Sequence, residues 1–325
     1  MIPVIHVSVN GQDVSSGVAG RLISGEVVLH QGGHADQATL VLSNWDGRLA
    51  KPPRGGMMEV SAGFADSGVA SLGQYIISDV TKLGPVATFH VCGHAADLKQ
   101  GLKQQQMRSF QQQTLGTILS TIAGENALMP ALDATLAAIT IPLLVQAHES
   151  DLHLITRLAR QHGALGSIKA GRLVFVPRGA GTSASGASLP PIIVRPEDLE
   201  GEFSLSASDR PKRGTVKAHH FDRGKGARVL HQANGTGDGP DYFLPHLHGS
   251  DDQADKACAA RAKDFKAQKR RFEGTFKSGL NAAIPGVPLM SAGFGDDDDR
   301  SWIIKTTSHH FGPGGYVTHF TAEGH

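Results

Sequence analysis

Histidines are the residues of this sequence best suited to metal binding, because there are 17 of them and neutral imidazole nitrogens are common zinc ligands. Two adjacent pairs, His219-His220 and His309-His310, lie within predicted strands, where neighbouring side chains point to opposite faces. Neither pair can hold one ion between its two rings. His246 and His248 would share a face of an extended segment but lack a third ligand at a known spacing, and Cys92-Gly93-His94 lacks a partner pair. The pattern therefore predicts no metal site.

Carboxylates are most concentrated in the run from Asp296 to Asp299. Calcium prefers oxygen ligands, but this run lacks the spaced acids, the central glycine and the terminal glutamate of an EF-hand loop. Four adjacent like charges also resist burial. We therefore expect a solvated turn that precedes a strand at Trp302.

The hydroxyl-rich and glycine-rich segments do not have the spacing of a catalytic or nucleotide site. Thr182 to Gly186 contains no G-x-S-x-G, and no strand leads directly into a helix there. Gly224-Lys225 is followed by Gly226 instead of Ser or Thr, and the glycine that a P-loop needs five positions earlier is missing. Gly235, Gly237 and Gly239 alternate in a predicted flexible loop. The sequence thus predicts no catalytic residue and no bound cofactor.

The charge balance excludes several classes of partner. A formal net charge of +1 predicts no specific nucleic-acid binding, and the basic run Lys263 to Arg271 is interpreted as the solvated face of an amphipathic helix.

No apolar stretch approaches the roughly 18–20 residues of a membrane span, and the N-terminal strand lacks the basic region of a signal peptide. Cys92 and Cys258 are expected to be free thiols that behave as small hydrophobic residues.

The clearest local unit runs from His148 to Gly179. Ser150 is a suitable N-cap, Asp151 complements the positive end of the helix dipole, and Gly163 suits the end of the helix. A tight turn at Ala170-Gly171 then predicts a hairpin. The apolar residues recur at helical spacing, at Leu154, Ile155, Leu158 and Ala159.

Three parts follow from the wider pattern, which is mainly β with an α+β insert. Residues 1–97 alternate as short strands and predict a first β domain. Residues 98–178 form a small α+β insert, with a helix capped by Thr114. Residues 179–325 predict a second β domain with a long helix at 251–271, after a linker at 179–190.

Several segments closely resemble the late control D proteins of contractile-tailed phages, which are tail baseplate hubs. The resemblance covers nearly the whole chain. It rests on Gly33–Gln37, Asp46–Gly55, Glu149–Leu152, Arg157–Ala159, Ile168–Leu173, Arg178–Gly181 and Trp302–Glu323.

The resemblance implies two tail-tube-like β-barrel or sandwich domains beside the helical α+β domain, and a structural, non-enzymatic role. Three subunits would form a homotrimer that adapts the sixfold tail tube to the threefold central spike and surrounds the channel. Its implied partners are the trimeric spike, the tail tube protein, the end of the tape-measure protein, and baseplate wedge or sheath-initiating proteins. Its implied place is the tail baseplate of a virion or bacteriocin particle assembled in a bacterial cytoplasm. We expect the insert to face outward.

Four alternatives remain open. A peptidoglycan-degrading hub would need two opposed carboxylates, and a metal-binding β protein would use the histidines. A fused type VI secretion spike is disfavoured because no repetitive β-helix follows the last strand, and a DNA-binding regulator is disfavoured by the net charge. Leu289-Met290 and Trp302 to Thr307 are candidate subunit contacts.

Overall fold

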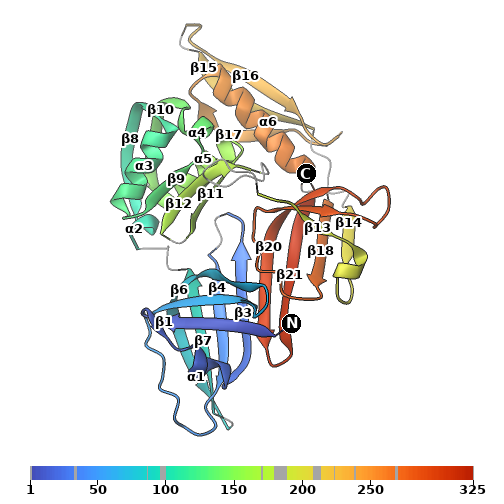
Figure 1. Cartoon of the computed structure of the whole chain (residues 1–325). Coiled ribbons are helices and arrows are strands. Elements are labelled where there is room, and N and C mark those ends of the chain that lie inside the picture. Colours follow the sequence, from blue (N-terminus) through green and yellow to red (C-terminus); the bar gives the residue numbers. More distant parts are fainter. Residues whose placement is uncertain are drawn as a thin grey trace.

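The structure is a computed structural model that describes residues 2–32, 35–85, 87–95, 100–169, 171–178, 189–207, 214–222, 224–237, 239–267 and 270–324. Strands predominate, and the largest sheet has 13 of them (Figure 1). Of the predicted linker at 179–190, only residues 189 and 190 are described. The segment Thr182 to Gly186 lies wholly outside the described residues.

The N-terminal β region contributes seven strands to the large sheet. Alternating burial along β4 and β7 shows that one face of this sheet is packed. The first turn, at Asn10-Gly11, has φ of 52° and 79°, as a two-residue hairpin turn requires. The elements are β1 (Pro3–Val9), β2 (Gln12–Asp13), α1 (Ser15–Ala19), β3 (Leu22–His30), β4 (Gln37–Ser43), β5 (Met57–Phe64), β6 (Gly68–Leu83) and β7 (Thr88–Ala95).

The α+β insert has its own apolar core, built largely from α3 and α5. The predicted caps are confirmed, since Thr114 accepts a hydrogen bond from the amide of Thr117 and Ser150 accepts one from His153. The hairpin around Gly171 is also confirmed. The elements are α2 (Gln100–Lys103), β8 (Gln105–Thr114), α3 (Leu115–Glu125), β9 (Met129–Leu132), α4 (Ala134–Ala137), β10 (Thr140–Ser150), α5 (Asp151–Gln161), β11 (Ala164–Lys169) and β12 (Arg172–Pro177).

The remaining residues divide between two sheets. A short three-stranded sheet carries the long helix on one face, in the order β16-β15-β17, and consists of β15 (Thr215–Asp222), β16 (Ala227–Asn234), β17 (Tyr242–His248) and α6 (Asp251–Ala267). The others join the large sheet, namely β13 (Ile192–Val194), β14 (Ser204–Ala207), β18 (Arg270–Phe276), β19 (Pro288–Ser291), β20 (Ser301–Gly312) and β21 (Gly315–Gly324), with the 3₁₀ helix η1 (Pro196–Asp198).

The predicted helix at 251–271 is too long. Helix α6 ends at Ala267, and Arg270 begins strand β18. Phe272, the third residue of β18, is fully buried in the C-terminal β core, against Phe294 and Phe320. The basic residues that start β18 have the same sequence character as the basic end of a helix. Burial of Phe272 in the aromatic core favours the strand.

Two predicted subunit contacts are buried within this chain. Leu289 and Trp302 lie in the C-terminal β core, with 0% and 1% of their surface exposed, so neither can meet a neighbour. The indole nitrogen of Trp302 also donates to the hydroxyl of Ser291 at 2.8 Å. Met290, which points the other way on its strand, is exposed.

The first and last parts of the chain share one sheet. Strand β3 pairs antiparallel with β20, with Thr306 opposite His30 and Phe311 opposite Gly25. In Figure 1 the blue N-terminal strands and the red C-terminal strands lie side by side at this junction. The domain boundaries stay predictions, but the backbone ladder joins the two β regions directly.

Gly25 allows this junction to close. A β-carbon at Gly25 would lie 2.0 Å from the buried ring of Phe311. We expect Gly25→Ala to destabilise the chain by about 1–3 kcal/mol, the usual range for overpacking. Gly17→Ala is the control, because a β-carbon there meets nothing within 4 Å. Urea unfolding measures both, and equal stability of the two variants would contradict this role.

Candidate assembly surfaces and the groove between them

A buried polar network holds the start of α5. Asp151 is 1% exposed, and its carboxylate accepts from the guanidinium of Arg108 at 2.6 Å. It also accepts from the amides of Gln146 at 2.9 Å and Asn126 at 3.1 Å. The sequence placed Asp151 at the helix dipole, but it missed this network because the partners lie 5–43 residues away. The network locks β8, β10, α3 and α5 together.

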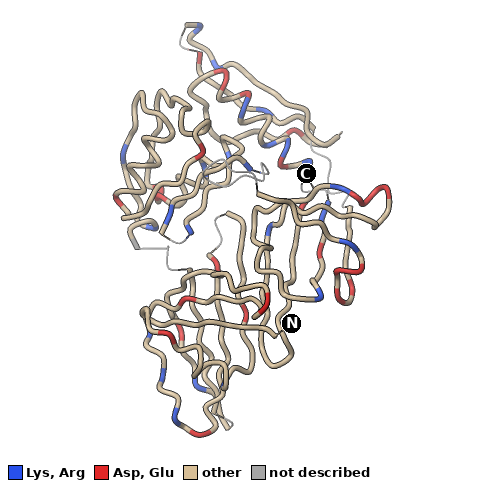
Figure 2. Tube along the Cα trace, viewed as in Figure 1, with Lys and Arg blue, Asp and Glu red and all other residues tan. Residues whose placement is uncertain are grey.

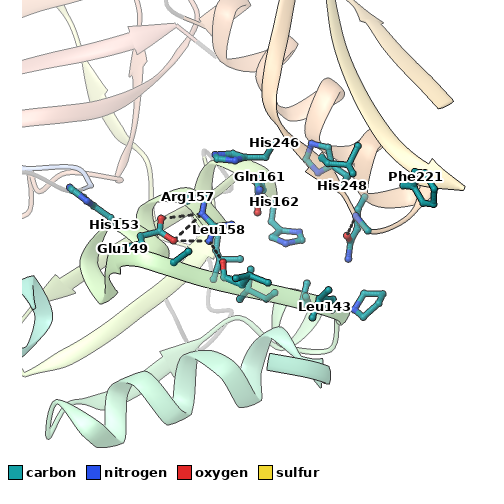
Figure 3. A pocket seen from close by; sticks show the side chains of 18 of the residues that line it. Leu143, Glu149, His153, Arg157, Leu158, Gln161, His162, Phe221, His246 and His248 are labelled. Atoms are coloured by element: carbon teal, nitrogen blue, oxygen red, sulfur yellow. Dashed lines mark hydrogen bonds and ion pairs between the residues drawn. The ribbon is translucent and has the colours of Figure 1, made fainter. Parts of the chain in front are cut away.

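An open groove of about 870 Å³ separates this insert from the three-stranded sheet. One wall is formed by β10 and α5 and carries Glu149, His153 and Arg157, and the other carries His246 and His248 from β17 (Figure 3). The predicted histidine pair His246 and His248 thus faces a groove, without a third ligand among the described residues.

The titratable groups of the groove include an arginine-paired carboxylate and three histidines with lowered pKa values. The carboxylate of Glu149 is held by Arg157, with the Nε–Oε1 distance at 3.0 Å and the Nη2–Oε2 distance at 2.7 Å. A general acid instead needs apolar surroundings that keep its carboxyl protonated. Burial lowers the pKa of His246 and His248, and it lowers that of His162 to about 4, so these rings favour the neutral form.

Among the described residues, the outer face of the three-stranded sheet carries exposed apolar side chains, two of which, Phe221 and Leu247, also line the groove. Its outer patch consists of Phe221, Leu230, Phe243 and Leu247, each roughly half exposed. His219 lies among them, with Leu230 and Leu247 as its partners on the two neighbouring strands. Its ring stacks on that of Phe243, with the ring centroids 6.1 Å apart. Exposed apolar patches of this kind mark contact surfaces.

The other residues considered in the sequence, namely the adjacent histidine pairs, the acidic run and the cysteines, do not line the groove. His219 and His220 do point to opposite faces, as do the buried His309 and the half-exposed His310. The run from Asp296 to Asp299 forms the expected turn before β20, and Asp299 accepts from the amides of Gly293 and Phe294. The structure leaves the two cysteines free. Burial raises the pKa of Cys258 to about 11, so its thiol stays protonated, as a small hydrophobic residue would.

Charges of both signs are spread over the described chain (Figure 2). Helix α6 carries acidic residues in its first turn and alternates charges along its length, for example in the pair Asp252–Lys256 at 2.7 Å. Among the described residues, no helix combines the length and the apolar character needed to cross a membrane.

The chain is mainly β, with a joined large sheet and an α+β insert, and this combination defines its fold class. Solved structures share this fold. The 43 kDa tail protein of prophage MuSo2 from Shewanella oneidensis superimposes with a TM-score of 0.75 at 12% identity, covering 98% of both chains. The c3393 protein of E. coli, a type VI secretion component, has a TM-score of 0.57 at 14% identity, covering 94% of this chain and 74% of its own.

The chain belongs to the phage tail baseplate hub (GPD) family, whose model matches residues 76–314. The probable baseplate hub protein of Escherichia phage 186 is 24% identical over 98% of this chain and 92% of its own length. The resemblance to late control D proteins, the mainly β fold and the place in the tail baseplate of a virion are thereby confirmed.

Proposed function

We propose that three copies of this chain form the homotrimeric hub that adapts the sixfold tail tube to the threefold central spike and surrounds the channel. The single observation that supports this most is the β3–β20 ladder, because it sets two β regions side by side in one sheet. Three chains then present six such regions around one axis. A closed ring also covers sheet edges that would otherwise aggregate.

The partners follow from the same arrangement. The tail tube protein would stack on one side of the ring and the trimeric spike on the other, with the end of the tape-measure protein in the channel. The insert would face outward, toward baseplate wedge or sheath-initiating proteins. The hub would act without catalysis, as its membership of a structural baseplate hub family suggests.

We further propose that the outer patch is covered by a neighbouring subunit. Apolar side chains in the centre of a contact, with a polar rim, are typical of protein interfaces. Phe243 suits this role best, because about half of its ring is exposed and Lys217 lies over it at 5.5 Å.

Light scattering tests the assembly. We expect a stable trimer, or a monomer that forms a three-plus-three complex with a trimeric spike. Phe243→Ser together with Leu230→Ser should reduce trimer formation at least tenfold, the scale of a contact worth more than about 1 kcal/mol per residue. Met107→Ser is the matched control, since Met107 is exposed on the insert, away from the patch. A monomer that ignores the spike would contradict the hub proposal.

A further inference from the structure

Three potential metal ligands converge where α6 begins over the β15–β16 hairpin. They are Nδ1 of His220, Nε2 of His231 and Oδ1 of Asp251. The two ring nitrogens are 2.7 Å apart, and the carboxylate oxygen lies 3.0 Å from His231 and 3.6 Å from His220. We propose that this cluster binds one divalent transition-metal ion, Zn²⁺ being the best match.

The distances suit a tetrahedral ion. Zinc–nitrogen and zinc–oxygen bonds of about 2.0–2.1 Å place neighbouring ligand atoms about 3.3 Å apart around a tetrahedron. The separations of 2.7 and 3.0 Å are hydrogen-bond distances that would lengthen by roughly 0.3–0.6 Å around an ion, and the separation of 3.6 Å would shorten slightly. Two imidazoles and one carboxylate are a set that zinc accepts, with water completing the fourth position.

A second carboxylate, that of Asp255, orients the ring of His231. Nδ1 of His231 lies 2.8 Å from Oδ1 of Asp255, one helical turn after Asp251. When Nδ1 carries the hydrogen that this contact uses, Nε2 presents its lone pair to the ion, as metal-binding histidines commonly do. The two carboxylates also balance the double positive charge of the ion.

The site combines burial with access. His220 and His231 are 7% and 9% exposed, so their rings are held by packing. The Asp251 side chain is 74% exposed, which leaves an entry path for an ion from solvent.

This part of the chain also has reason to need a crosslink. Its fully buried apolar side chains are small, namely Val216 and four residues of alanine or cysteine size on α6 and β15, while the larger Tyr242, Leu244 and Phe265 are only partly buried against them. Small units with little apolar burial are commonly stabilised by a metal or a disulfide. An ion at this site would join the hairpin to the first turn of α6 (Figure 1). This inference concerns one chain alone and does not depend on the trimer.

Isothermal titration of the untagged chain with Zn²⁺, after removal of metal by EDTA, tests the proposal. We expect one ion per chain with a dissociation constant in the micromolar range or below, and a melting temperature that rises by a few degrees. Co²⁺ should give the visible absorption of a tetrahedral site.

Asp251→Asn should weaken zinc binding at least tenfold, and its exposure makes misfolding of this variant a minor concern. His231→Asn should abolish binding. His219→Asn is the matched control, because His219 neighbours His220 but points to the opposite face, and it should bind like the unmodified chain. Absence of stoichiometric binding, or equal binding by Asp251→Asn and the unmodified chain, would overturn the proposal.

Discussion

Replacing Asp151 by alanine is expected to destabilise the α+β insert by about 3–5 kcal/mol, the usual loss when one partner of a buried ion pair is removed. The variant leaves Arg108, Gln146 and Asn126 turned toward a space without a carboxylate. Arg108 is partly exposed and also pairs with Glu125, which places the loss at the lower end of that range. Unfolding in urea at pH 7, followed by hydrogen exchange of the α5 amides, measures it.

Asp133→Ala is the matched comparison for this result. Asp133 caps α4 in the same insert by accepting from the amides of Thr135 and Leu136. Loss of a cap costs about 1 kcal/mol. If both variants lose the same amount, Asp151 acts only through the helix dipole, and the network adds nothing to stability.

Acid is expected to weaken the chain through His309. The ring is fully buried, and burial lowers its pKa to about 4 from 6.5. The unfolded chain therefore gains a proton near pH 6.5 that the folded chain refuses until about pH 4. Stability is complete above pH 6.5, falls through this window, and loses roughly 3 kcal/mol from this one group.

His309→Asn removes the titration while keeping a group that can hydrogen-bond Tyr316 and Thr318. Its stability should depend less steeply on pH between 6.5 and 4 than that of the unmodified chain, although its value at pH 7.5 is lower. His94→Asn is the control, since His94 is exposed on β7, away from the proposed subunit contact. Parallel pH curves for His309→Asn and the unmodified chain would refute the assignment.

Much of the candidate site was beyond the reach of pattern reasoning. His220 and His231 become neighbours through the hairpin turn at Gly226, whose φ is +60°, and Asp251 arrives from a helix 31 residues after His220. The one usable local signal was the pair Asp251 and Asp255, two acidic residues one helical turn apart at the start of the predicted long helix. Pairing only the histidines that are adjacent or two residues apart in the sequence does not bring His220 together with His231.

The sequence by itself determined the features that depend on neighbouring residues. Ser150 and Thr114 cap their helices, Asn10-Gly11 turns the first hairpin, and the Leu154 to Ala159 stripe is buried, because caps, turns and periodicity act within a few residues. Only the tertiary structure decided the β3–β20 ladder, the end of α6, the burial of Trp302 and the network of Asp151. Each depends on a partner distant in the chain, and packing selects that partner through burial and paired hydrogen bonds that local preference cannot specify.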